Sequence, residues 1–366
     1  MPRLVPRAQP SRALGAASPL LALAFTVAFA AMLFAAFDKD VALALRVLLI
    51  EPWNGIRAVT ELLLKATPLI LIALGLALCF RSNVWNIGAE GQYLIGGTVA
   101  GGLAMWLTTE GVTMSPFAFL PLAIAAGAVG GAAWAAIVAL LRDRFSANEI
   151  LVSLMLVYVA DQLLSWLVFG PWKDPRGFNM PQTVTFDVGI PRLITGYRLN
   201  WGFVIALLGV AAMWLFMART YRGFAMQVGG LAPAAARYAG FSARGALWLA
   251  LLTSGALAGV AAALDVTGPV GQLTPYVSLG YGFTAIIVAF VGRLHPLGCA
   301  LAALLLSTFL IGGELLQSRV GLPAAMSGVF QGVLLITLLA CDTLIHYRIQ
   351  WRAPQAAAAA TARAAA

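Results

Sequence analysis

The sequence predicts an all-α, polytopic membrane protein with about ten transmembrane helices. Hydrophobic residues make up 61% of its 366 residues and charged residues only 10%, whereas a typical soluble domain has about 25% charged residues. Apolar runs of about twenty residues, the length that crosses the bilayer core as a helix, recur from end to end. These observations exclude an ordinary soluble globule.

The apolar segments divide the chain into two tails and one membrane domain. Residues 1–18 are basic, and we expect a cytoplasmic tail there. The apolar run after it is too long for the core of a signal peptide, so we expect an uncleaved first span. Residues 346–366 are alanine-rich and predict a second cytoplasmic tail of low complexity. The membrane domain between them, 19–345, holds ten predicted spans: 19–37, 62–80, 92–107, 116–144, 148–169, 201–218, 246–263, 280–292, 297–313 and 324–345.

Three segments between the spans have their own character. Residues 41–50 are apolar but too few to cross, so we expect them at the outer surface. The longest polar connection, 171–200, contains prolines and the alternating run TVTFDV, which predicts a folded external (periplasmic) loop. A basic loop, 219–245, follows the sixth span.

The eighth span is too short to cross alone. Thirteen residues, 280–292, rise about 20 Å as helix against a core of roughly 30 Å. This length predicts a broken helix of the kind that lines transport paths. The polar runs NIGAEGQ (86–92) and SLGYGFT (278–284) precede apolar pieces at corresponding places in the chain. Inverted repeats would explain this similarity, and chance is the competing explanation.

The basic residues predict the orientation. Ten crossings place both termini on one side, and most of the 23 Lys and Arg residues fall in segments on that side, which is therefore expected to be cytoplasmic. The net charge of +9 does not indicate nucleic acid, because the cations are scattered singly between apolar segments next to membrane lipids.

Polar residues gather at the junction of the second and third spans, in NVWNIGAEGQYLIGG (83–97). A carboxylate and several amides in hydrocarbon would be costly, so the run must be packed inside protein, line a wet cavity or lie at the interface. The alternative is a plain cytoplasmic turn with glycines at its bends.

Signatures of catalysis are absent from the sequence. It contains no GxxxxGK[ST] loop, HExxH, nucleophile elbow or paired Cys/His cluster. Cys79, Cys299 and Cys341 have no metal or redox spacing and are interpreted as buried small hydrophobes. We expect no enzyme, no catalytic residue, no metal and no cofactor of its own.

Four motifs carry a resemblance to a known family. They are NVWNIGAEGQYLIGG (83–97), ANEILVSLMLVY (147–158), GFAMQVGGLAPAAARYAGF (223–241) and LGYGFTAIIVAFVGRLHPLG (279–298). Together they resemble the permease subunits of bacterial ABC importers for simple sugars and nucleosides, a group related to the ribose and branched-chain amino acid permeases. The residues of NIGAEGQ and FTAIIVAF most resemble those of the nucleoside branch, which implies a nucleoside substrate. A pentose or hexose is the alternative substrate.

The resemblance implies an assembly in the bacterial inner membrane. Such permeases pair as homo- or heterodimers, bind two cytoplasmic ABC ATPase domains that hold the ATP, and receive substrate from a periplasmic or lipoprotein binding protein. A stand-alone secondary transporter is a rival hypothesis, with Asp161 as its main intramembrane carboxylate. A receptor or other non-transporting subunit is a second rival, which leaves the polar breaks unexplained.

The basic loop has the signals of a short helix. Proline stands in its first turn and glycine after its end. By resemblance this is the coupling helix that docks on the ATPase, and the alternative is an amphipathic helix on anionic lipid. The residues assigned to coupling are Pro233, Ala234, Ala235, Arg237, Tyr238 and Gly240.

Amides and hydroxyls of the motifs are assigned to the substrate path, because they hydrogen-bond a neutral polyhydroxylated ligand without bringing net charge into the membrane. The alternative is that they cap helices or hold the bundle, as Asn148 would at a helix start. The residues are Asn83, Asn86, Glu90, Gln92, Asn148, Glu149, Tyr281 and Thr284.

Overall fold

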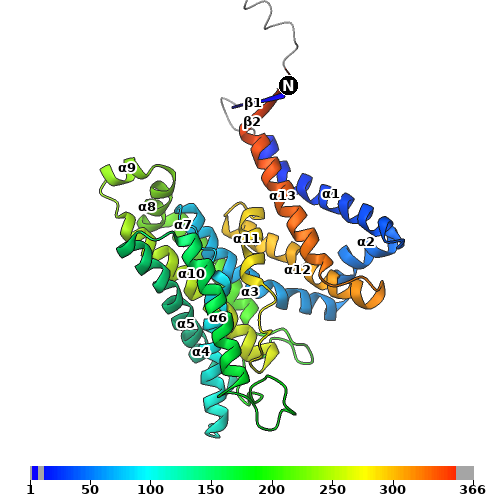
Figure 1. Ribbon diagram of the computed structural model, residues 1–366, viewed down its shortest axis with the longest axis vertical. Helices are drawn as coiled ribbons and strands as arrows, with labels where there is room; N and C mark the ends of the chain where they lie inside the picture. Colours follow the sequence, from blue (N-terminus) through cyan, green and yellow to red (C-terminus); the bar gives the residue numbers. More distant parts are fainter. Residues whose placement is uncertain (1, 7–11, 352–366) are drawn as a thin grey trace, which may run out of the picture.

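The computed structural model describes residues 2–6 and 12–351, and most of them are helical (Figure 1). The helices are α1 (Arg12–Ala36), α2 (Val41–Leu49), η1 (Glu51–Trp53), α3 (Ile56–Arg81), α4 (Ala89–Thr109), α5 (Pro116–Phe145), α6 (Glu149–Phe169), α7 (Gly202–Arg219), α8 (Tyr221–Leu231), α9 (Pro233–Tyr238), α10 (Ala243–Asp265), the π-helix η2 (Val266–Val270), α11 (Tyr281–Val291), α12 (Pro296–Arg319) and α13 (Met326–His346). The all-α prediction is confirmed.

A short antiparallel sheet joins the two ends of the described chain. Strand β1 (Pro2–Pro6) pairs with β2 (Tyr347–Trp351). The sheet therefore takes in part of each predicted tail, and α1 begins at Arg12, upstream of the predicted start of the first span. Residues 1, 7–11 and 352–366 of the predicted tails lie outside the described part of the chain.

Eight described helices are long and apolar enough to cross a membrane: α1, α3, α5, α6, α7, α10, α12 and α13. The other two predicted spans are helices α4 and α11. Helix α4 starts with the polar residues Glu90 and Gln92, and α11 has only 11 residues, about 16 Å of rise. The chain is a multi-pass membrane protein, and the count of about ten crossings is not confirmed.

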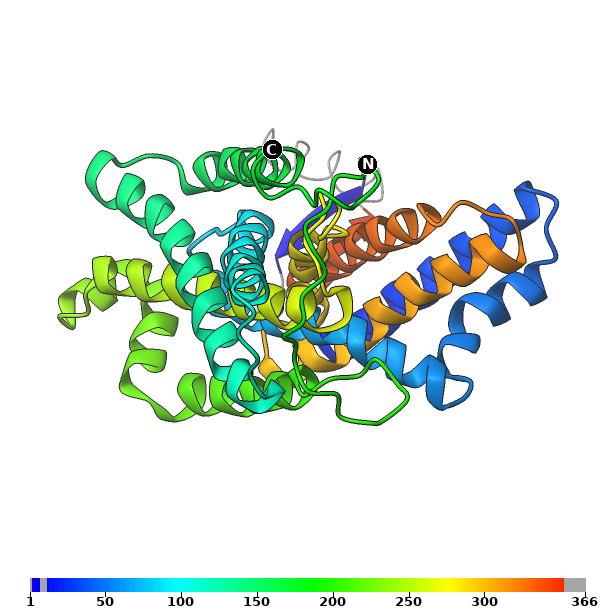
Figure 2. The ribbon, with the colours of Figure 1, turned by 90° about the horizontal axis from the view of Figure 1, so that it is seen from below.

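Helix α3 lies at the centre of the bundle, where it packs against α7, α10, α11 and α12 (Figure 2). Protein buries 89% of its apolar stretch, compared with 22% for α6. Outer helices such as α6 instead expose large apolar side chains, among them Leu151, Met155 and Tyr158. Such outward apolar surface suits contact with lipid tails.

Helices α5 and α10 cross in direct backbone contact through two small-residue motifs. Gly127 and Gly131 on α5 face Gly255 and Gly259 on α10. A Cβ atom on Gly259 would lie 1.9 Å from the Gly127 carbonyl oxygen, and one on Gly131 would lie 2.1 Å from that of Gly255. Two GxxxG motifs thus let the helices approach as closely as helices do in membranes.

The helix starts follow from local hydrogen bonding. Side chains at the N-cap accept bonds from backbone N–H groups of the first turn, which have no partner within the helix. These N-caps are Asp40 for α2, Ser115 for α5, Asn148 for α6, Thr220 for α8 and Ser242 for α10.

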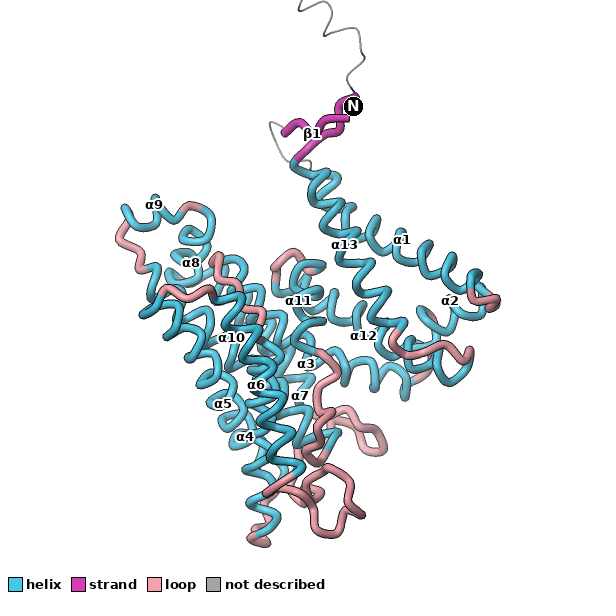
Figure 3. Tube along the Cα trace, viewed as in Figure 1, coloured by secondary structure: helices cyan, strands magenta, loops and turns pink. Residues whose placement is uncertain are grey.

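The long connection 171–200 is folded against the segment that follows α10. The Thr183, Phe186 and Ile190 amides donate to carbonyl oxygens of Leu273, Gly271 and Thr267. Phe186, Val188 and Ile190 are buried and alternate with more exposed neighbours, as the TVTFDV pattern predicts. Figure 3 shows this loop at the opposite end of the molecule from α9.

Candidate functional site

The polar run after α3 forms a buried amide pair. Helix α3 ends at Arg81, residues 82–88 are irregular, and α4 begins at Ala89. The Asn86 Nδ2 donates to Gln92 Oε1 at 2.9 Å, and Gln92 Nε2 donates back to Asn86 Oδ1 at 3.0 Å. Both side chains are fully buried. Because the two amides satisfy each other, they hold the irregular segment in place.

The same segment is tied to two further helices. Asn86 Nδ2 also donates to Ser254 Oγ of α10 at 3.0 Å, and the Ile87 amide donates to Ser153 Oγ of α6 at 3.3 Å. The run is therefore packed inside protein, and the plain-turn alternative is wrong for Asn86 and Gln92. Ser153 and Ser254 were not predicted, since isolated serines in apolar spans give no sequence signal.

Glu90 joins the starts of two helices. It lies in the first turn of α4, is 6% exposed, and its Oε2 accepts a hydrogen bond of 2.6 Å from the Gly282 amide in the first turn of α11. A Cβ atom on Gly282 would lie 2.5 Å from the Glu90 Cα, so only glycine fits there. A carboxylate at two helix N-termini is favoured by both dipoles. The two glycine-rich runs that resemble each other in sequence thus meet at this bond.

Two tyrosines and an aspartate adjoin this junction. The Tyr93 hydroxyl donates to Asp265 Oδ2 at 2.6 Å, and its ring lies 5.8 Å from that of Tyr281. Tyr93 and Tyr281 are both buried. Tyr93 and Asp265 were not predicted as site residues, although a carboxylate at the end of an apolar span is a recognisable signal.

Thr284 contacts a helix from the end of the chain. Its Oγ1 donates to Gln331 Oε1 of α13 at 3.3 Å, and Gln331 is 5% exposed. The first turn of α11 is therefore bound by α4 through Glu90 and approached by α13 through Gln331. Gln331 was another residue that the motifs did not indicate.

Three predicted path residues lie elsewhere. Asn83 is exposed on the irregular segment and accepts a hydrogen bond from Trp85 Nε1 at 3.3 Å. Asn148 is the N-cap of α6, and Glu149 pairs with Arg142 at the end of α5. These contacts stabilise helix ends. That the three residues also line the substrate path stays a prediction.

The predicted short helix of the basic loop is present as α9. Pro233 occupies its first position, and Gly240, with a φ of 79°, follows its end. Tyr238 is 97% exposed and Leu231, just before the helix, is 87% exposed. Helix α8 was not predicted, because Gly223, Gly229 and Gly230 suggested a loop.

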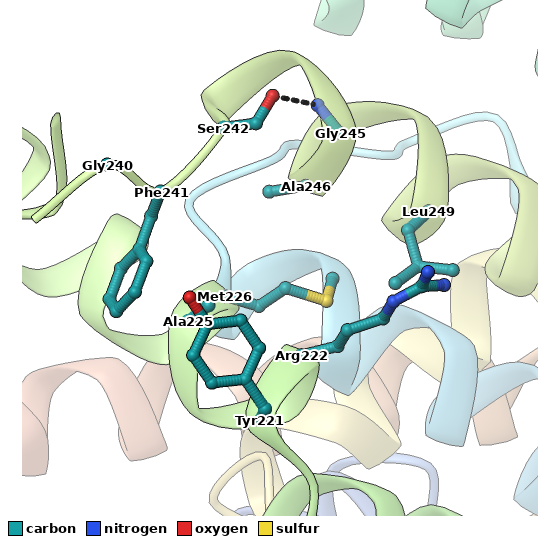
Figure 4. Close-up of a pocket in the computed structure, with 10 residues that line it drawn as sticks. All are labelled: Tyr221, Arg222, Ala225, Met226, Gly240, Phe241, Ser242, Gly245, Ala246 and Leu249. Atoms are coloured by element: carbon teal, nitrogen blue, oxygen red, sulfur yellow. Dashed lines mark hydrogen bonds between the residues drawn. The ribbon is translucent and has the colours of Figure 1, made fainter.

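Aromatic side chains pack the connection between α9 and α10 against α8. The Phe241 ring contacts the edges of Tyr221 and Phe224 at centroid distances of 5.7 and 6.3 Å. Figure 4 shows the adjacent cavity of about 360 Å³, with Arg222 extending beside Leu249. Its lining combines one cation with apolar and aromatic groups. The described residues contain no group of three or more His, Cys, Asp or Glu side chains that could hold a metal.

The fold and the site define a polytopic, helical membrane protein with a polar junction buried between interrupted helices. Residues 58–339 match the family described as branched-chain amino acid transport system / permease component, and the chain belongs to this family. The resemblance stated from the motifs is thus confirmed. Members are transport permeases, so the chain is a transport component and not an enzyme.

Several curated proteins are similar along most of their length. A glucose ABC transporter permease of Haloferax volcanii is 32% identical over 91% of this chain and 89% of its own. A guanosine ABC transporter permease of Bacillus subtilis is 30% identical over 87% of this chain and 91% of its own. A nucleoside ABC transporter permease of Lactococcus lactis is 28% identical over 80% of this chain and 82% of its own. No solved structure matches the chain.

Proposed function

We propose that this chain forms the translocation path for nucleosides in an ABC importer of the bacterial inner membrane. Simple sugars are the alternative substrates. Similarity to guanosine and nucleoside permeases supports the first class, and similarity to a glucose permease supports the second. Both classes are neutral and rich in hydroxyl groups, and they share a sugar ring.

The observation that carries the proposal is the bond between Glu90 and the Gly282 amide. It joins two helices that start inside the protein after irregular chain, at 82–88 and at 271–280. Irregular backbone at membrane depth is tolerated where it is buried in protein or lines a cavity, and transporters place their substrate sites at such breaks. A receptor subunit would not require this arrangement.

The partners and energy source are part of the proposal. The sequence has no phosphate-binding loop, so we assign ATP to two separate cytoplasmic ATPase domains. A second permease chain, identical or related, and a substrate-binding protein complete the assembly. Helix α9, with its exposed Tyr238, is the surface we assign to ATPase docking. Both termini are then cytoplasmic, on the side of α9, as the placement of the β1–β2 sheet in Figure 1 supports.

Uptake by cells tests the substrate class. A strain lacking this chain should lose uptake of radiolabelled nucleosides and keep uptake of branched-chain amino acids. Restoring the chain on a plasmid should restore nucleoside uptake. If nucleosides still enter and a pentose or hexose does not, the sugar alternative is correct and the nucleoside assignment is wrong.

A further inference from the structure

A small polar cavity of about 170 Å³ lies beside the Glu90 junction. It is lined by the first half of α3, the end of α10 and the chain that leads into α11. Tyr281, the first residue of α11, belongs to this lining, and the next amide along the chain is the one that Glu90 binds. The cavity therefore adjoins the junction on the side of the folded loop 171–200.

The Asp265 carboxylate lines this cavity and can accept further hydrogen bonds. Its Oδ2 accepts a hydrogen bond of 2.6 Å from Tyr93, and within residues 2–6 and 12–351 no other hydrogen bond to it is found. The side chain is half-buried. An ionised carboxylate offers about four acceptor positions, so Oδ1 is left to bind a donor in the cavity.

The charges around the cavity favour a neutral ligand. Lys65 pairs with Glu314 at 3.3 Å, and Arg198 pairs with Glu61 at 3.4 Å. Among the described residues Asp265 has no ion pair. Its charge opposes a phosphorylated ligand, and the two cations in the lining already pair with carboxylates. Hydroxyl donors suit the carboxylate better.

The size and the aromatic wall point to one sugar ring. Typical ligand pockets measure roughly 300–1,000 Å³, so this cavity holds only part of a nucleoside. Tyr276 and Tyr281 line this cavity together with Asp265. An aromatic face next to a carboxylate matches a sugar ring, whose C–H groups pack on the ring while adjacent hydroxyls donate to the oxygens.

We propose that Asp265 binds the vicinal hydroxyls of the substrate's sugar ring, the 2′- and 3′-hydroxyls of a nucleoside, next to the Glu90 junction. Tyr93 holds the carboxylate through Oδ2 and Tyr281 forms the wall of the site. This inference rests on the proposed function, since it assigns the part of the substrate that the path recognises. It adds a specificity determinant that the four motifs do not contain.

Uptake of adenosine and 2′,3′-dideoxyadenosine, measured with the complete transporter in proteoliposomes, tests the proposal. Wild type should prefer adenosine. In Asp265→Asn, which keeps the size and an acceptor for Tyr93, the ratio of the two initial rates should fall by about tenfold, equivalent to about 1.4 kcal/mol. Asp187→Asn removes an exposed carboxylate that lies outside this cavity, and its ratio should match wild type.

The possible outcomes distinguish a failure of the Asp265 site from a failure of the nucleoside function. If wild type takes up neither compound, the nucleoside function is wrong. The role of Asp265 is then tested under the sugar alternative, with the uptake of glucose compared with that of 2-deoxyglucose in the same variants. If wild type takes up adenosine but does not prefer it, or if the ratio is unchanged in Asp265→Asn, the role of Asp265 is overturned and the nucleoside function stands. Asp265→Ser carries the same expectation should the Asn variant fail to reach the membrane.

Discussion

Gly230 of α8 packs directly on the backbone of Arg81, the last residue of α3. A Cβ atom on Gly230 would lie 2.1 Å from the Arg81 carbonyl oxygen. Arg81 is followed by the irregular segment that carries Asn86 and leads to Glu90. The hairpin that we assign to ATPase docking therefore contacts the end of α3, next to the polar junction. We expect motion of the hairpin to reach the junction through this contact.

Gly230→Ala should weaken the coupling of ATP hydrolysis to uptake. The added methyl group has to push α8 away from α3, and overpacking of this kind costs about 1–3 kcal/mol. We expect less uptake per ATP hydrolysed in proteoliposomes, with the ATPase still bound. Gly229→Ala is the matched control, because its Cβ would meet no atom within 4 Å. Equal coupling in the two variants would rule out this contact as the path.

Ala236→Pro should break α9 and abolish substrate-stimulated ATP hydrolysis together with uptake. It removes the Ala236 amide, which donates to the Ala232 carbonyl oxygen at 3.0 Å, at a local cost of about 3 kcal/mol. Ala235 lies in the first turn, where proline is better tolerated, so Ala236 is the sharper position. Ala236→Gly keeps the amide and should retain most activity. The coupling assignment is wrong if Ala236→Pro transports normally while the purified permease keeps its melting temperature.

Gly259→Ala should destabilise the permease by separating α5 from α10. The new methyl group would meet the Gly127 carbonyl oxygen at 1.9 Å, and neither backbone can move without losing contact along the crossing. The melting temperature of the purified protein in detergent should fall clearly. Gly328→Ala on α13 should leave it unchanged, because no atom lies within 4 Å of the added group. A normal melting temperature for Gly259→Ala would contradict the tight crossing.

Single cysteines should establish the orientation. Asp187 and Ala235 are both exposed. The loop 171–200, which contains Asp187, and α9, which contains Ala235, lie at opposite ends of the molecule (Figure 1). In a background without Cys79, Cys299 and Cys341, Asp187→Cys should react with an impermeant maleimide in intact cells. Ala235→Cys should react only after the membrane is opened. The reverse labelling would place the termini and α9 outside and contradict the topology.

The parts of the fold that the sequence predicts well are those set by local rules. Apolar length located the long helices, and proline at Pro233 with glycine at Gly240 located α9. Helix α8 was missed because three glycines suggested a loop, although tertiary contacts of Gly223 and Gly230 explain two of them. Packing against neighbouring backbone overrode the weak helix propensity of glycine.

The candidate site was predicted only in part, because its contacts join distant segments. The motifs contain Glu90 and Gly282, but nothing in either run indicates that they bind each other across 192 positions. Asp265 and Gln331 lie outside the motifs and reach the site through the fold. Asn148 and Glu149 have polar side chains for a local reason, the start of α6, which a motif alone does not separate from substrate binding.

We expect substrate to pass the junction of α4 and α11, and thiol labelling tests this path directly. Leu279 is exposed and lines the cavity beside Tyr281. In the cysteine-free background, a water-soluble methanethiosulfonate added outside should modify Leu279→Cys and stop nucleoside uptake, and excess nucleoside during turnover should slow the modification. Asp187→Cys should be modified without loss of uptake. Full uptake after modification of Leu279→Cys, or a modification rate that nucleoside does not change, would show that substrate does not pass this junction.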